Sequence, residues 1–324
     1  MSLENTRLTR RSFSILGAGA ISAASLLGIA AKAIAQDATP GASPEVADLG
    51  AFEGLDLTEI VVSATQYTYS ASVPGAMPEG WYIITLKNDS DAVASLNLAM
   101  LPEGTSGGDL SSAVSQSFQG EGGEMPDWWE NATFAGGNVA AAGASNSTLA
   151  YLVPGKWYMF STNPASTQSP SSFNILTSEE LDENYGITSE ATPEASPVSA
   201  APEGVVATSN VDVEDDSLTL DNEPAAAQQV LQVTNGGDQV HDVVILRTDD
   251  TLDESGAASL ATSWAKGEET NATVLGGVGT LSPGATAFAA LDVEPGTYIA
   301  FSSLPDENGG LQVDNGVVAI FSAQ

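Results

Sequence analysis

An internal repeat constrains the fold of this chain more than any other feature of its 324 residues. The pair Pro154-Gly155 precedes KWYMFS, and the pair Pro295-Gly296 precedes TYIAFS, so the same turn opens an alternating apolar run twice. The second run is followed by a loop rich in Gly, Asn and Asp and by another apolar run at residues 317–321. This order predicts a strand, a loop and a strand at the end of the chain.

Two further segments match in the same order. LKNDSDAVASLNLAML, which starts at residue 86, matches VTNGGDQVHDVVILRT, which starts at residue 233. ENATFAGG at residues 130–137 matches TNATVLGG at residues 270–277. Three anchors in one order, with similar gaps, indicate two copies of one structural unit.

Within each unit the apolar residues mostly alternate with a period of two, in short segments separated by Gly, Pro, Asn and Asp. This pattern is typical of strands. Residues 109–120 and 252–267 instead carry apolar side chains near helical spacing. The sequence therefore predicts an all-β fold of two tandem β-sandwiches, each with a short helical insertion.

Residues 1–35 have the pattern of an export signal. The pair Arg10-Arg11, which resembles a twin-arginine signal, precedes an uncharged apolar stretch at residues 15–31, and Ala-Ile-Ala at residues 33–35 is a small-residue cleavage site. We expect a protein that is secreted, periplasmic or on the cell surface, with no transmembrane segment once the signal is removed. The alternative is a retained anchor, because about 17 apolar residues is near the lower limit for a membrane span.

Two segments rich in Pro, Ala and Ser divide the rest of the chain. They are predicted linkers at residues 36–48 and 179–204, because such compositions cannot bury enough apolar surface to become ordered. The predicted domains are residues 49–178, which match the repeat less well, and residues 205–324.

The charge of the chain limits its partners. There are 42 acidic residues against eight basic ones, and the formal net charge is −34. Nucleic acids and anionic lipids are bound through clusters of Lys and Arg, so neither is an expected partner. The expected partner is an unidentified extracellular or envelope ligand, with divalent cations as a second candidate.

The candidates for calcium ligands are acidic residues in two loops. They are Asp249, Asp250, Asp253 and Asp306. Carboxylate oxygens suit calcium, but neither loop has the spacing of an EF-hand. The alternative is that both loops are simply solvated.

The second unit resembles the cupredoxin family in three features. It has an Asn-containing turn at Asn235, a histidine on the following strand at His241, and a closing segment after Pro295-Gly296 in the place of the family's P-G-x-Y-x-x-x-C and H-x-x-x-G-M motifs. The resemblance covers most of residues 205–324 and, more weakly, residues 52–178. It implies two Greek-key cupredoxin-like β-sandwiches, a fold that usually carries copper and transfers electrons.

The copper ligands of that family are largely missing here. His241 occupies the position of the first histidine, but Ser302 stands at the cysteine position, Gln312 at the second histidine and Val317 at the methionine. In the first unit the histidine position is Ala94, and the chain contains no cysteine. Because a blue-copper site needs two imidazoles and a thiolate, we expect no cofactor.

His241 is the single histidine of the chain, and three roles are open to it. It can be a buried structural residue, a weak metal contact, or a catalytic base that acts on Ser302. The third role needs an orienting carboxylate such as Asp242. Adjacent residues on a strand point to opposite faces, so Asp242 is expected to point away.

Tryptophan precedes the second anchor in both units, twice in the first unit and once in the second. Trp128, Trp129 and Trp264 can form a stacking platform for a sugar or aromatic ligand, or they can belong to the core. Their repeated position favours the core.

These observations favour a secreted or cell-envelope binding or structural protein built from two copper-less cupredoxin-like domains, and not an enzyme. The alternative is a copper-handling or electron-transfer protein of the cupredoxin family with an atypical site. A hydrolase or lyase is least favoured, because His241 is the sole histidine on which such a site could be based.

Overall fold

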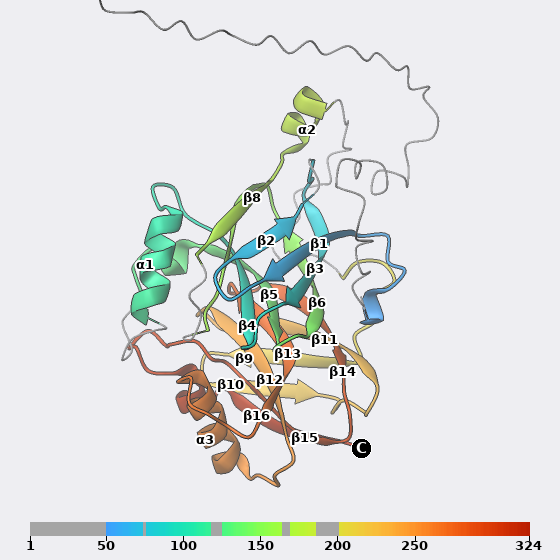
Figure 1. Cartoon of the computed structure of the whole chain (residues 1–324), viewed down its shortest axis with the longest axis vertical. Helices are drawn as coiled ribbons and strands as arrows, with labels where there is room; N and C mark the ends of the chain where they lie inside the picture. Colours follow the sequence, from blue (N-terminus) through green and yellow to red (C-terminus); the bar gives the residue numbers. More distant parts are fainter. Residues whose placement is uncertain (1–49, 74–75, 118–124, 164–168, 186–200) are drawn as a thin grey trace, which may run out of the picture. The chain divides into compact units, whose positions relative to one another are not determined.

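Strands dominate the structure, and the two repeats form the same pattern of strand pairs. The computed structural model describes residues 50–73, 76–117, 125–163, 169–185 and 201–324, and Figure 1 colours the elements in chain order. Three α-helices, each of twelve residues or fewer, occur in these ranges. The predicted fold class, all-β with a short helical insertion in each unit, is confirmed.

The elements of the first repeat alternate with short turns. Its strands are β1 (Thr58–Ala64), β2 (Tyr69–Ser72), β3 (Gly80–Asn88), β4 (Ala94–Met100), β5 (Thr133–Ala140), β6 (Ser145–Leu152), β7 (Gly155–Phe160) and β8 (Ser171–Ile175). Its helical segments are η1 (Gly50–Phe52), α1 (Gly107–Ser117), η2 (Trp129–Asn131) and α2 (Ser178–Tyr185).

The second repeat has the same order. Its strands are β9 (Ser209–Glu214), β10 (Ser217–Asp221), β11 (Gln228–Asn235), β12 (His241–Thr248), β13 (Thr273–Leu281), β14 (Thr286–Asp292), β15 (Gly296–Phe301) and β16 (Val318–Ala323). Its helical segments are α3 (Glu254–Ala265) and η3 (Gln312–Asn315).

Each strand pair of the first repeat has a counterpart in the second. β1 runs parallel to β3, as β9 does to β11, and β3 pairs with β6 as β11 pairs with β14. In the other sheet β4 lies between β5 and β7, as β12 lies between β13 and β15. The mixture of parallel and antiparallel pairs arises because strands that are consecutive in sequence cross between the two sheets.

The sheets continue from one repeat into the other. β14 pairs with β6, and β13 pairs with β5, so each of the two sheets contains eight strands, four from each repeat. Where β14 pairs with β6, Thr148 lies opposite Ala289. The pairs on either side are Phe288 with Leu149 and Ala290 with Ser147. The Asn97 side chain adds a buried link, because its Oδ1 accepts a 2.8 Å hydrogen bond from the Thr280 N–H.

The asparagine of the first anchor ties a loop to a strand in both repeats. Asn88 Nδ2 donates to the carbonyls of Ala92 and Ala140, and Asn235 Nδ2 donates to those of Gln239 and Leu281. Both asparagines are buried, and a buried amide group needs such partners. The repeated sequence therefore reflects a repeated hydrogen-bond requirement.

Helices α1 and α3 pack on the two ends of the second sheet's outer face through their apolar residues. In α3, Ala257 and Ala261 are buried, and Trp264 packs edge-on against Phe301 with ring centroids 5.7 Å apart. Near α1, Trp129 is 4% exposed and lies 4.6 Å from the ring of Phe134. These positions place Trp129 in the core, while Trp128 and Trp264 are half-buried. Within the described ranges, no helix combines the length and apolar character needed to cross a bilayer.

The predicted linkers and domain boundaries have different outcomes. The export signal at residues 1–35 and the linker at residues 36–48 lie outside the described residues. Helix α2 (Ser178–Tyr185) overlaps the start of the second predicted linker, residues 179–204, and the linker remains a prediction. The boundaries of the two domains, at residues 49–178 and 205–324, remain a prediction.

Candidate functional site

The structure brings the four copper-ligand positions of the second repeat together. His241 is the first residue of β12, Ser302 follows β15, Gln312 begins η3, and Val317 precedes β16. All four side chains are buried, with exposed fractions of 0 to 1%. His241 Nδ1 lies 2.7 Å from Gln312 Oε1, and Ser302 Oγ lies 2.5 Å from the same oxygen. The loop between β15 and β16 therefore places Ser302 and Gln312 against the start of β12.

The amide of Gln312 is held from both sides. Its Nε2 donates to the carbonyl of Val240 at 2.9 Å and to that of Pro305 at 3.3 Å. These two acceptors fix which end of the amide carries the nitrogen, so Oε1 faces His241 and Ser302. His241 Nδ1 must then be the donor to Gln312 Oε1.

The second ring nitrogen of His241 faces a carboxylate. Nε2 lies 3.2 Å from Oδ1 of Asp215, a residue of the turn between β9 and β10. The same Oδ1 accepts hydrogen bonds from the backbone N–H groups of Asp238 and Gln239. Both ring nitrogens thus lie within hydrogen-bond distance of oxygen acceptors.

The carboxylate of Asp215 is stabilised in its charged form. Burial alone would raise its pKa, but the N–H of Gln239, the ring of His241 and the N–H of Asp238 outweigh burial and hold the pKa below its usual value. Asp215 therefore presents a charged carboxylate to the Nε2 atom of His241.

The expectation that Asp242 points away from this cluster is wrong. Ser302 Oγ lies 2.9 Å from Asp242 Oδ1, and Asp242 also accepts hydrogen bonds from the N–H and the hydroxyl of Ser303 at 2.7 and 2.5 Å. The strand register shifts between His241 and Val243, and such an irregularity breaks the alternation of side chains between faces. Burial raises the pKa of Asp242, although the hydrogen bonds from Ser303 and Ser302 oppose the shift.

The first repeat contains a neutral version of the same arrangement. Ser95 stands where the second repeat has Asp242, and its Oγ accepts a 3.1 Å hydrogen bond from the N–H of Thr162. Ser161, the counterpart of Ser302, lies 3.4 Å from Ser95 Oγ. With Ala94 in place of His241, this repeat has neither the imidazole nor the carboxylate.

The cluster in the second repeat does not fit copper. Blue-copper sites need a thiolate and two imidazoles, whereas Ser302 and Gln312 offer a hydroxyl and an amide. Gln312 Oε1 lies at the Nδ1 atom of His241, in the direction from which a metal would have to bind that nitrogen. These side chains therefore do not provide the ligand set of a blue-copper site.

The four calcium candidates do not converge. Asp253 caps helix α3 by accepting a hydrogen bond from Gly256 N–H, Asp250 accepts one from Asn271, and Asp249 is exposed beside Arg247. Among the described residues, no group of three or more His, Cys, Asp or Glu side chains is arranged to hold a metal ion.

Asp306 is engaged within its own loop. Its carboxylate accepts hydrogen bonds from the N–H groups of Asn308 and Gly310 and from the Asn315 amide. Burial would raise its pKa, but these bonds outweigh burial and lower the pKa. The carboxylate thus organises the turn between β15 and η3.

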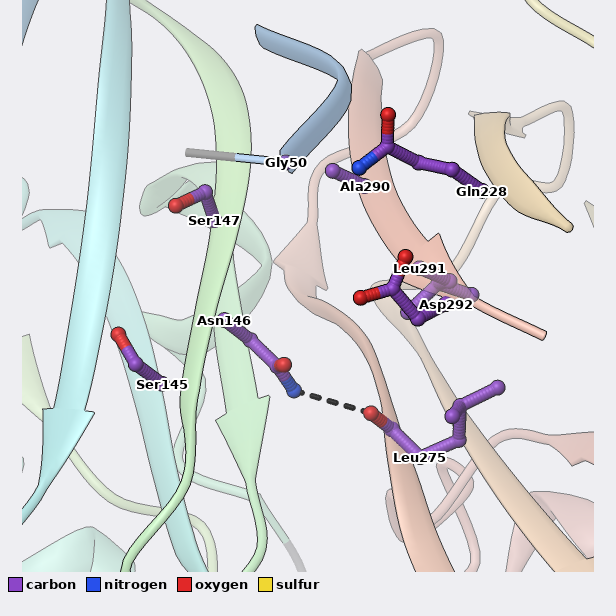
Figure 2. A pocket seen from close by; sticks show the side chains of 9 residues that line it. All are labelled: Gly50, Ser145, Asn146, Ser147, Gln228, Leu275, Ala290, Leu291 and Asp292. Atoms are coloured by element: carbon purple, nitrogen blue, oxygen red, sulfur yellow. Dashed lines mark hydrogen bonds between the residues drawn. The ribbon is translucent and has the colours of Figure 1, made fainter. Parts of the chain in front are cut away.

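A small cavity of about 110 Å³ lies where β6 and β14 diverge beyond their last pair. Figure 2 shows Asn146 and Ser147 on one strand, Ala290 and Asp292 on the other, and a hydrogen bond from the Asn146 amide to the carbonyl of Leu275. Asp292 is the single charged side chain of its lining. The cavity therefore lacks the paired groups that acid–base chemistry uses.

The residues that the sequence did not predict come from loops. Asp215 lies in an Asp-Asp turn that any hairpin prediction would find, but its contact with His241 depends on the parallel pairing of β9 with β11. Ser303 follows the apolar run of β15 and carries no signal of its own.

No family model and no curated protein matches this chain. Among solved structures, auracyanin from Roseiflexus castenholzii is 16% identical with a TM-score of 0.26, over 37% of this chain and 99% of auracyanin. Auracyanin A from Chloroflexus aurantiacus, described as a blue copper protein, is 10% identical with a TM-score of 0.24, over 36% of this chain and 98% of its own. The blue copper oxidase from Nitrosomonas europaea is 11% identical with a TM-score of 0.21, over 82% of this chain and 85% of its own. Likenesses this low say nothing about the chemistry of this chain.

Proposed function

We propose that this chain is an exported, non-catalytic binding or structural protein whose two cupredoxin-like domains hold no copper. The observation that carries the proposal is that the side chains at the positions of the cupredoxin copper ligands contact one another. His241 Nδ1 is occupied by Gln312, and Ser302 lies between Gln312 and Asp242. Side chains that contact one another in a buried cluster support the fold, and their polar atoms are not open to a metal ion.

Burial also argues against catalysis at this cluster. His241 and Ser302 are 1% and 0% exposed, so a substrate has no access to them. A triad would need Ser302 within hydrogen-bond reach of His241, whereas Gln312 Oε1 contacts both.

Export and the nature of the partner rest on the sequence. The paired arginines, the apolar stretch and the Ala-Ile-Ala site within residues 1–35 support passage across a membrane. A formal net charge of −34 favours a partner that is cationic or reached through divalent cations, in the extracellular space or the envelope.

Metal analysis of the purified protein tests the proposal. After incubation with Cu(II) and desalting, we expect no stoichiometric copper and no intense visible absorption, because no thiolate is present to donate charge to the metal. Stoichiometric copper that resists a mild chelator would overturn the proposal and support the alternative, a copper-handling or electron-transfer protein with an atypical site.

A further inference from the structure

The hydroxyl of Ser302 stands between two oxygen acceptors. Its Oγ lies 2.9 Å from Asp242 Oδ1 and 2.5 Å from Gln312 Oε1. A serine hydroxyl has one proton to donate, so it cannot donate to both. The present contact places Oγ as the donor to Gln312 Oε1, and when the proton turns to Asp242 a lone pair of Oγ is left facing the Gln312 amide.

The Gln312 amide is oriented and polarised for attack. Its oxygen contacts the Nδ1–H of His241 at 2.7 Å, and its nitrogen is held by the Val240 carbonyl. Asp215 holds the other ring nitrogen of His241 and so fixes the imidazole. A fixed donor aimed at a carbonyl oxygen stabilises the negative charge that develops there when a nucleophile adds.

We propose that Ser302 and Gln312 become joined by an ester bond that the protein forms by itself. Ser302 Oγ attacks Cδ of Gln312, the Oγ–Cδ bond forms, and the Cδ–Nε2 bond breaks. Asp242 accepts the hydroxyl proton, which passes to the departing nitrogen, and the nitrogen leaves as ammonia. Nothing is oxidised or reduced, and no co-reactant is consumed.

Burial supports both the reaction and its product. Ser302 is fully buried and Gln312 is 1% exposed, so the water that would hydrolyse an ester is excluded. The contact joins residues ten apart in sequence, and the bond would close the loop between β15 and η3. The fold holds the two reacting groups together, which lowers the entropic cost of the step.

The first repeat is a natural control within the same chain. Ser161 occupies the position of Ser302, but Ser95 and Ala94 replace the carboxylate and the imidazole. Without a base or a polarised amide, Ser161 is expected to remain a free hydroxyl. The inference does not depend on the proposed function, because it concerns a modification of the chain and not its partner.

Mass spectrometry of the full, mature protein tests the proposal. Digestion by a protease that cleaves after Asp and Glu cuts at Asp306 and Glu307, between the two residues. We expect the peptides containing Ser302 and Gln312 to remain joined, with a combined mass lower by one ammonia, and to separate in hydroxylamine. Two separate peptides of unmodified mass would overturn the proposal.

Peptide mapping is required in addition to the intact mass. Loss of one ammonia from the whole protein also arises when an N-terminal glutamine, such as Gln36 after cleavage of the predicted signal, cyclises. A loss that maps to residue 36 alone, with separate Ser302 and Gln312 peptides, would count against the ester.

Variants identify the groups involved. Ser302→Ala and Asp242→Asn should abolish the joined pair, whereas Ser303→Ala should retain it, because the Ser303 hydroxyl contacts Asp242 without contacting Gln312. A pair that stays joined in Ser302→Ala would show that the bond is not the proposed one. The wild-type map keeps the proposal falsifiable if a variant fails to fold.

Discussion

Single glycines in the second anchor hold the strands of each repeat in an irregular register. Gly277 has a φ of 149°, and a Cβ atom there would lie 2.0 Å from the carbonyl oxygen of Val243. Gly137 has a φ of 143° and stands equally close to the carbonyl of Leu96. Only glycine fits such positions, which explains why the Gly-Gly pair recurs in both repeats.

Gly277→Ala should therefore lower the free energy of unfolding by at least about 1–3 kcal/mol, from backbone strain together with the clash at Val243. Gly108→Ala is the control, because Gly108 lies in helix α1 without a positive φ, and alanine there should stabilise by about 0.5–1 kcal/mol. Urea denaturation of both variants measures the difference. Equal effects would mean that the space at Gly277 is not restricted.

Asp215 gives the protein a specific sensitivity to acid. Its pKa is lower in the folded state, so the stability it contributes is present above its unfolded pKa and is lost as the pH falls through the folded value. Asp215→Asn should remove part of the acid dependence of unfolding and leave a smaller loss between neutral and low pH. Asp216→Asn changes the same charge in the same turn, at an exposed position, and should retain the wild-type dependence. Indistinguishable pH profiles for the two variants would contradict the role of the hydrogen bonds that Asp215 accepts from Gln239, His241 and Asp238.

The sequence predicted some of the side-chain contacts around His241 and missed those of Asp242 and Asp215. The resemblance to cupredoxins correctly implied that His241, Ser302 and Gln312 lie close together. The position of Asp242 was missed because alternation assumes a regular strand, and the register shifts beside it. Asp215 was missed because its contact is set by a neighbouring strand and not by local sequence.

At the scale of elements, local patterns identified two helices and missed a third. α3 lies within the window at residues 252–267, and α1 begins two residues before the window at residues 109–120 and ends inside it. α2 was missed because its single buried side chain, Leu181, gives almost no apolar pattern. A capping box was the available signal, because the Thr177 hydroxyl accepts from Glu180 N–H while the Glu180 carboxylate accepts from Thr177 N–H.

Helix α3 depends on its N-terminal cap. Asp253 accepts a 2.8 Å hydrogen bond from Gly256 N–H, so Asp253→Ala should lower the free energy of unfolding by about 0.5–2 kcal/mol. Asp249→Ala, in the same acidic segment but with an exposed side chain, should change the free energy of unfolding far less.

Thermal denaturation with and without calcium also tests the cation candidates. A calcium-dependent gain that Asp253→Ala alone abolishes would show that this carboxylate binds the ion and does not merely cap the helix.

At the scale of the whole molecule, the repeat predicted two copies of one unit but not how they join. Alternation shows which face of a strand is buried, whereas the pairing of β14 with β6 involves strand edges, which leave no periodic signature. Thr148 and Ala289 each stand six residues before the Pro-Gly anchor of their repeat, and they lie opposite each other. The edge is therefore nearly symmetric, as in a dimer of two identical copies.

This symmetry predicts the behaviour of the second repeat alone. Residues 201–324 expressed without the first repeat should be folded and mainly β by circular dichroism, but they should present the free edges of β14 and β13. A second copy can cover these edges in the way that β6 and β5 do, so light scattering should report dimers that dissociate on dilution.

Ala290→Lys should shift the fragment toward monomer. In a symmetric dimer the two-fold axis would pass at Ala289, so the variant places like charges from both copies beside that axis. A fragment that remains a folded monomer at every concentration would show that this edge does not need a partner, and an unfolded fragment would show that each repeat requires the other to fold.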